Sequence, residues 1–108
     1  MIVAVTFVVT QEALEFIASK NMKTPNIVVY RDASGTIYGY TTREPTFISR
    51  VKVTDREPNE LFVVADNTCG IPIWVEKGLF LRLSNTVVIA LKKELRKKLE
   101  LQTGGHWP

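Results

Sequence analysis

Runs of β-branched and aromatic residues, separated by short polar segments, dominate the chain. These runs cover residues 2–9, 26–31, 36–42, 47–54, 61–65, 71–75 and 87–91. Within the 47–54 run, apolar and polar positions alternate, which places Val51 and Lys52 on opposite faces of a strand. The pattern predicts a β-rich α+β fold, organised as a single domain over residues 1–102 and followed by a flexible tail at 103–108.

One segment has the period of a helix instead. Residues 11–20 place Ala13, Leu14 and Ile17 on one side, and Thr10 stands directly before them as an N-cap. The sequence therefore predicts one firm helix at about residues 11–20, packed on a sheet through Leu14 and Ile17. Residues 77–83 are consistent with a short second helix of one or two turns.

Polar, glycine-containing segments between the strand-like runs predict two hairpins. Residues 32–35 end in Ser34-Gly35, which favours a turn between the runs at 26–31 and 36–42. Residues 66–70 similarly separate the next pair of runs. Pro72 has no N–H to donate to a strand ladder, so we expect it on an edge strand or at a bulge.

Residues 92–101 fit two different structures. Leu91, Leu95 and Leu99 recur every four residues, which favours an amphipathic helix that buries Leu95 and Leu99. The alternation at residues 99–101 is equally consistent with a short strand. The pattern leaves both alternatives open.

The positive charge is concentrated at the end of the chain. Residues 1–76 contain seven basic and nine acidic side chains, whereas residues 77–108 contain seven basic and two acidic ones, for a net charge of +3. The excess falls mainly on Lys92, Lys93, Arg96, Lys97 and Lys98. These five residues are the candidate partner-binding residues, because such a run suits phosphates or an acidic protein surface. A solvated surface without a partner is the alternative interpretation.

Cysteine and histidine are too scarce for most metal chemistry. The chain contains one cysteine, Cys69, and one histidine, His106. A structural zinc site needs about four such ligands, and an intrachain disulfide needs two thiols. The sequence therefore predicts no cofactor, no metal and no enzymatic activity. Cys69 is a candidate reactive thiol, with an inert turn residue as the alternative. One unpaired thiol and no export signal or membrane span lead us to expect a cytoplasmic protein.

Three stretches resemble one family of proteins. Residues 9–14 are similar to a "T-x-x-A" helix start, residues 33–40 to "Cys-Ser-Gly-x-x-Tyr-Gly-Leu", and residues 60–62 with 70–76 to "D-x-V-F" and "D-G-V-x-V-x-V-D". These motifs belong to the HesB-like, A-type iron–sulfur carriers. Together the stretches span roughly residues 6–92. The resemblance implies a HesB-like small β-sandwich.

The resemblance fails at the residues that bind the cluster. Ala33 stands where the family has its first ligating cysteine, and residues 103–108 contain no counterpart of the C-terminal Cys-Gly-Cys. The resemblance therefore implies a non-enzymatic, partner-binding relative of cluster carriers that has lost its own site, or that borrows ligands from a partner chain. We expect a protein partner, including a second copy of the chain, and no membrane. The alternative function is a small basic module that binds nucleic acid or an acidic protein through its C-terminal segment.

Overall fold

The computed structural model describes residues 6–37, 40–66, 69–80 and 86–102, which form two β-sheets and two helices. The strands are β1 (Thr6–Val9), β2 (Asn26–Ile37), β3 (Tyr40–Thr54), β4 (Phe62–Asp66), β5 (Ile73–Glu76), β6 (Thr86–Lys93) and β7 (Lys97–Gln102). The helices are α1 (Gln11–Ser19) and α2 (Lys77–Phe80). The predicted β-rich α+β class is confirmed, and α2 confirms the short second helix. The predicted tail at 103–108 lies outside the described residues.

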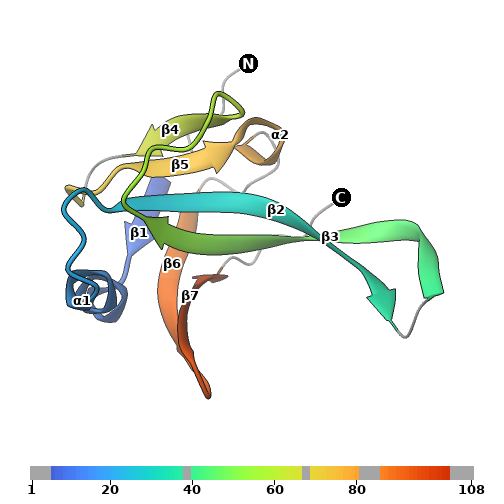
Figure 1. The fold of residues 1–108 in the computed structure, drawn as a ribbon, viewed down its shortest axis with the longest axis horizontal. Helices are drawn as coiled ribbons and strands as arrows, with labels where there is room; N and C mark the ends of the chain where they lie inside the picture. Colours follow the sequence, from blue (N-terminus) through green and yellow to red (C-terminus); the bar gives the residue numbers. More distant parts are fainter. Residues whose placement is uncertain (1–5, 38–39, 67–68, 81–85, 103–108) are drawn as a thin grey trace.

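Two sheets of different size cross one another (Figure 1). The smaller sheet has the order β1-β6-β7, with β1 parallel and β7 antiparallel to β6. The larger has the order β3-β2-β5-β4, in which β2 and β5 are parallel and the other neighbours are antiparallel. Strand β3 of the larger sheet lies against β7 of the smaller one. This contact joins the two sheets beside the C-terminal hairpin.

A single core lies between the sheets. Its buried residues come from both sheets and both helices and comprise Phe7, Ala13, Ile17, Ile27, Val29, Ile73, Val75, Leu79, Val87, Ile89 and Leu99. Val51 and Val53 pack against this core, whereas Lys52 is exposed, so the alternation predicted for this strand is confirmed. Because every described element except β3 and β4 contributes a buried residue and these two add partly buried ones, the described residues form one domain.

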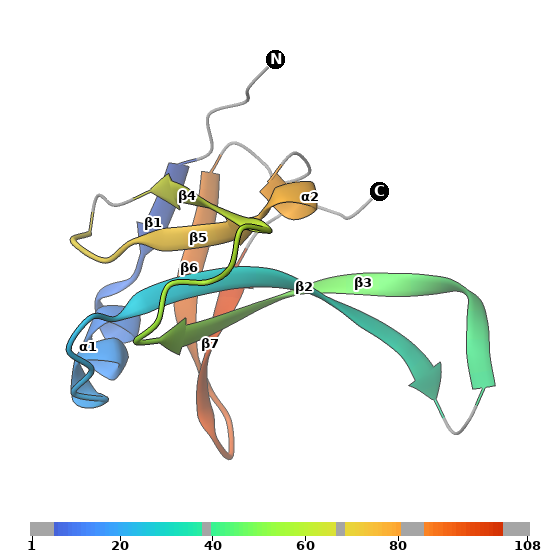
Figure 2. The ribbon, with the colours of Figure 1, turned by 45° about the horizontal axis from the view of Figure 1, so that its top comes forward.

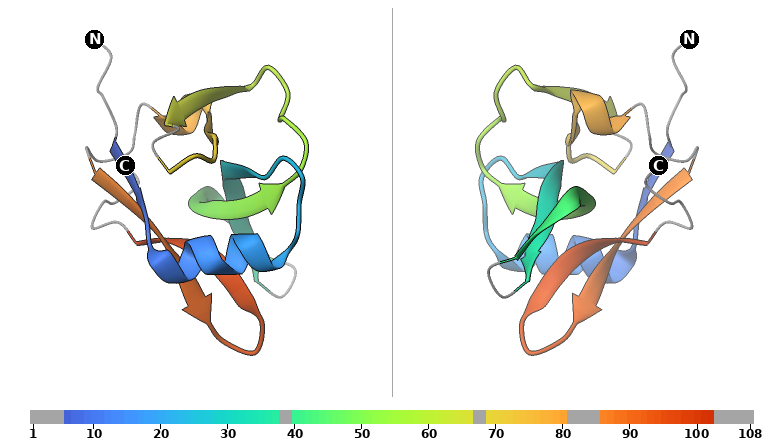
Figure 3. Two further views of the ribbon diagram at one scale, coloured as in Figure 1. Left: turned by 90° about the vertical axis from the view of Figure 1, so that its left-hand side faces the viewer. Right: turned by 90° about the vertical axis from the view of Figure 1, so that its right-hand side faces the viewer.

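Helix α1 begins and ends at identifiable residues. Thr10 Oγ1 accepts a hydrogen bond from the Ala13 N–H at 3.3 Å, as expected of an N-cap. Asn21 has a φ of 53°, the left-handed conformation that commonly terminates helices, so the helix ends at Ser19. The predicted packing is confirmed for Ile17, which is buried, while Leu14 is only half-buried. Figure 3 shows α1 running along one side of the two sheets.

The predicted turn at residues 32–35 is wrong. Strand β2 continues through this segment, pairing Asp32 with Ile48 and Ser34 with Thr46, and reaches Ile37. The register shifts after Ser34, so Gly35 lies at an irregularity inside a long antiparallel ribbon. A glycine between two β-rich runs marks a bulge as well as a turn, and the sequence pattern does not separate these cases. Figure 2 shows the ribbon extending away from the rest of the molecule.

The second predicted hairpin is confirmed, but the expectation for Pro72 is only partly met. Strands β4 and β5 are antiparallel neighbours, as residues 66–70 predict. However, β5 lies inside the sheet between β2 and β4 rather than at its edge. Pro72 precedes the first residue of β5, and its carbonyl accepts a hydrogen bond from the Ile27 N–H at 3.0 Å. Because Pro72 lies before the strand, the ladder does not need the N–H that proline lacks. The register of β4 shifts opposite Ile73, the next residue.

Residues 92–101 form a strand hairpin and not a helix. Strand β7 pairs with β6, so that Leu91 faces Leu99 across the ladder, and residues 94–96 connect the strands. Leu99 is buried, as the helical alternative requires, but Leu95 is fully exposed in the connection. The helical prediction, with Leu95 buried, is therefore wrong. Pairing with β6 satisfies the backbone of this segment, which a four-residue leucine spacing cannot reveal.

Candidate basic interface

The candidate residues at the C-terminus meet on one projecting hairpin. We call Lys92, Lys93, Arg96, Lys97 and Lys98 the hairpin cations. Lys92 lies directly opposite Lys98 and Lys93 directly opposite Lys97, while Arg96 is in the connection. Because successive strand residues point to opposite faces, each face of the hairpin carries one lysine pair. Figure 2 shows the hairpin reaching beyond the rest of the two sheets.

The two lysines of each cross-strand pair repel each other, and one lysine of each pair has a carboxylate partner. Like charges placed directly opposite destabilise a strand pair. Lys92 Nζ lies 3.1 Å from Glu94 Oε1, and Lys93 Nζ lies 2.9 Å from Glu12 Oε2. In each case the pKa of the lysine is raised above its usual 10.5. The larger cause is the hydrogen bond to the carboxylate, and the smaller is the negative charge of that carboxylate. Each of these two lysines therefore already has an anionic partner at the surface.

The other three hairpin cations lack this compensation. Arg96, Lys97 and Lys98 are exposed, and they form no ion pair with any residue in the described ranges. Their charge is therefore available to an external anion.

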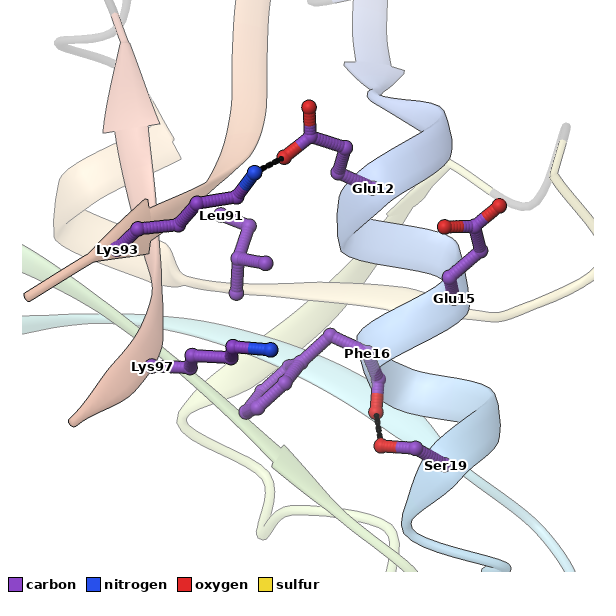
Figure 4. A pocket seen from close by; sticks show the side chains of 7 residues that line it. All are labelled: Glu12, Glu15, Phe16, Ser19, Leu91, Lys93 and Lys97. Carbon is purple, nitrogen blue, oxygen red and sulfur yellow. Dashed lines mark hydrogen bonds and ion pairs between the residues drawn. The ribbon is translucent and has the colours of Figure 1, made fainter.

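A groove of mixed charge separates the hairpin from α1 (Figure 4). It has a volume of about 530 Å³ and is lined by Glu12, Glu15, Phe16, Ser19, Leu91, Lys93 and Lys97. Lys97 extends from the hairpin toward the Phe16 ring, while the Lys93–Glu12 pair spans the groove nearby. With two carboxylates and two ammonium groups, this groove has no strong preference for an anion.

A second groove, which shares Phe16 and Lys97 with the first, has a different composition. We call it the lysine groove; it has a volume of about 230 Å³ and is lined by Phe16, Lys20, Val51, Lys52, Val53, Lys97, Lys98 and Leu99. Four of these eight residues are lysines, and none of the described residues that line it is acidic. The remaining four residues are apolar, and we refer to them together as the floor of the groove: Phe16, Val51, Val53 and Leu99. The lysine groove thus combines strong positive charge with an apolar surface.

Two lysines of this groove lie over aromatic rings instead of carboxylates. Lys20 Nζ is 4.7 Å from the centre of the Phe16 ring, and Lys52 Nζ is 5.1 Å from that of Tyr30. Such cation–π contacts orient an ammonium group without neutralising its charge. Both ammonium groups therefore keep their full charge for an external anion.

A third hollow extends the positive surface along the other face of the hairpin. Its lining includes the cations Arg50, Lys92 and Lys98 together with one carboxylate, Glu100, and its volume is about 400 Å³. Arg50 Nε lies 2.6 Å from Asp32 Oδ2, so this guanidinium is already paired. Because Lys98 lines both this hollow and the lysine groove, the two are adjacent. The hairpin is therefore flanked by cations on both faces.

The sequence identified the hairpin cations but missed Lys20 and Lys52. Lys20 caps α1 and Lys52 belongs to β3, so both are distant from the hairpin in the chain. The available signal was the alternation that places Lys52 on the outer face of its strand. That β3 lies against β7, however, follows only from the tertiary structure.

Cys69, the candidate reactive thiol, lies next to the segment that leads into β5. It is half-buried beside the core, and its Sγ lies 3.6 Å from the Ile71 carbonyl oxygen as a weak hydrogen-bond donor. Within the described residues, no group of three or more His, Cys, Asp or Glu side chains could hold a metal ion. Ala33 lies on β2 opposite Phe47, and His106 is outside the described residues.

Comparison with known proteins identifies no family. No family model, curated protein or solved structure matches the chain. Of the helices in the described ranges, none is both long and apolar enough to cross a bilayer.

Proposed function

We propose that the protein is a non-enzymatic module that binds nucleic acid through the projecting β6–β7 hairpin. The observation that carries this proposal is the placement of Lys92 opposite Lys98 and of Lys93 opposite Lys97. Folding alone does not favour two like-charged pairs in a short strand ladder. A polyanion bound at the hairpin would offset this repulsion, because each phosphate attracts the lysines that it contacts.

The surroundings of the hairpin favour nucleic acid over an acidic protein. Apolar and aromatic groups, including Phe16, Val51 and Leu99, are interleaved with the lysines beside the hairpin. Nucleic acids present phosphates together with flat apolar bases, and their binding sites combine cations with aromatic or apolar platforms. A nucleic acid therefore supplies partners for both the lysines and the apolar residues of this surface.

The direct test is a titration of the purified protein with labelled single-stranded and duplex nucleic acid at about 50 mM and about 200 mM salt. We expect binding that weakens strongly as salt rises. The double variant Lys97→Glu/Lys98→Glu should weaken it further while leaving the thermal midpoint nearly unchanged, because exposed charges contribute little to folding.

A matched control uses basic residues outside this surface. Lys77 begins α2, and Arg56 lies in the segment between β3 and β4; both are exposed. Lys77→Glu/Arg56→Glu makes the same change in net charge away from the hairpin, so it should weaken binding much less. Equal weakening by both double variants would indicate a net-charge effect and contradict the proposed site. Binding of a polyglutamate peptide in preference to nucleic acid would assign the surface to an acidic protein.

We also propose that the chain is a diverged relative of the HesB-like carriers that has lost its own cluster site. The positions of the resembling stretches support this proposal. Residues 9–14 span the junction of β1 and α1, residues 33–37 end β2, residue 40 begins β3, and residues 70–76 lead into and include β5. The family motifs thus coincide with element boundaries in this chain. An experimental structure compared with a HesB-like carrier tests the fold.

A further inference from the structure

We propose that the lysine groove binds a single strand of nucleic acid, with its phosphates at the lysines and a base on the apolar floor. This inference rests on the proposed function and extends it, since it assigns the class of nucleic acid and adds Lys20 and Lys52 to the contact surface. Both residues lie outside the hairpin, so their contribution can be separated from that of the hairpin cations.

The charge of the groove selects an anion. One hollow of about 230 Å³ is lined by four lysines from three parts of the fold: Lys20 from the C-cap of α1, Lys52 from β3, and Lys97 and Lys98 from β7. The neighbouring groove, which contains Glu12 and Glu15, is mixed in charge, whereas the described lining of the lysine groove contains no carboxylate. Four lysines line this one hollow, and their like charges favour the binding of an anion there.

The floor of the groove selects an anion that also carries an apolar part. Phe16, Val51 and Val53 are half-buried, so part of each side chain remains accessible in the groove, although Lys20 Nζ already lies over one face of the Phe16 ring. A base of a single strand can lie on such a platform while its phosphates reach the surrounding lysines. A phosphate or sulfate ion alone would leave this apolar surface in water.

The size of the groove favours one strand over two. Pockets for drug-sized ligands usually measure roughly 300–1,000 Å³, so a volume of about 230 Å³ admits a single unpaired base but not a base pair. In a duplex the bases are stacked and paired inside, and only the phosphates and sugars could approach the lysines. The apolar floor therefore contributes to binding only when bases are unpaired.

The experiment compares three labelled ligands of equal length, about 12 nucleotides, by fluorescence anisotropy. They are a single strand, the same strand with abasic sites in place of bases, and a duplex. We expect the unmodified protein to bind the single strand most tightly. The abasic strand keeps every phosphate, so its weaker binding would measure the contribution of the bases. Equal binding of the abasic and normal strands, or tighter binding of the duplex, would overturn the inference.

Single neutralisations then test the groove itself. Lys52→Gln and Lys20→Gln should each weaken single-strand binding about fivefold near 0.1 M salt and lower the salt slope by about 0.7. Lys77→Gln removes the same charge from α2 and should leave binding nearly unchanged. Thermal melting of each variant checks that the fold is retained. If Lys97→Glu/Lys98→Glu weakens binding but Lys52→Gln and Lys20→Gln do not, the hairpin binds nucleic acid and the groove does not. If no ligand binds the unmodified protein, the proposed function itself fails.

Discussion

Lys93 Nζ lies 2.9 Å from Glu12 Oε2, and this ion pair connects the β6–β7 hairpin to the first turn of α1. The hydrogen bond and charge of Glu12 raise the pKa of Lys93 above 10.5. Because the folded-state pKa is raised, the contribution of the pair is fully present at neutral pH. It is lost only as pH rises through the folded pKa, above 10.5. Lys93 and Glu12 therefore carry opposite charges, and can form this contact, across the physiological pH range.

Replacing Glu12 should strengthen nucleic-acid binding with little effect on stability. Glu12→Gln releases Lys93 from its carboxylate, so we expect tighter binding and a salt slope larger by about 0.7 for a single strand. The thermal midpoint should fall only slightly, because exposed ion pairs contribute little to folding. Glu15→Gln is the matched control, since Glu15 lines the same groove with no ion pair to a described residue. Identical effects of the two variants would show that the specific contact is irrelevant.

A buried asparagine should contribute more to stability than an exposed one. Asn26 is buried; its Oδ1 accepts a hydrogen bond from Trp74 Nε1 at 2.9 Å, and its Nδ2 donates to the Thr24 carbonyl at 2.9 Å. Asn26→Ala leaves these partners unsatisfied, which typically costs about 1–3 kcal/mol in the free energy of unfolding. Asn59→Ala removes one exposed hydrogen bond, to the Leu61 N–H, and should cost less. Urea denaturation measures both, and an equal cost would contradict the assigned network.

Much of the fold was predictable because its signals are local. The alternation around Val51 and Lys52, the N-cap at Thr10 and the turn before β5 each depend on neighbouring residues. The failures are of another kind. Gly35 is compatible with a turn or a bulge, and only the pairing of β2 with β3 decides between them. Leu95 is compatible with a helix or a hairpin until the pairing of β7 with β6 is known.

The candidate site was predictable only in part for the same reason. The five hairpin cations lie close together in the sequence, within residues 92–98, so they can be recognised there as a charged run. The lysine groove requires that the end of α1, the outer face of β3 and strand β7 meet, and that arrangement depends on how the two sheets cross. Lys20 and Lys52, read along the chain, are ordinary surface lysines.

The packing of α1 gives a direct test of the core. Ile17 is 2% exposed and contributes to the core between the sheets. Ile17→Ala should lower the free energy of unfolding by about 2–5 kcal/mol, since it removes buried methyl groups and leaves a cavity. Glu15→Ala, at an exposed position of the same helix, should change it by less than about 0.5 kcal/mol. Urea denaturation measures both variants. Similar small changes would place α1 away from the core.

The isolated chain should not assemble an iron–sulfur cluster. Cluster binding usually needs several thiolates, whereas this chain has one, Cys69. Anaerobic reconstitution with iron and sulfide should leave the purified protein colourless. Cys69→Ser serves as the control and should behave identically. A stoichiometric charge-transfer band that disappears in Cys69→Ser would show that a cluster is held by this thiol, with further ligands from another copy.

The same substitution should have very different effects on stability at two leucines of the C-terminal hairpin. Leu95 is fully exposed in the connection, whereas Leu99 is 5% exposed and faces Leu91 across the ladder. Leu99→Ala should destabilise the protein by about 2–5 kcal/mol, because it removes buried apolar atoms beside the core. Leu95→Ala removes no buried contact, so the free energy of unfolding should change by less than about 0.5 kcal/mol. Chemical denaturation separates the two structures proposed for this segment. An amphipathic helix buries both leucines and predicts two similar, large losses, whereas the hairpin predicts only one.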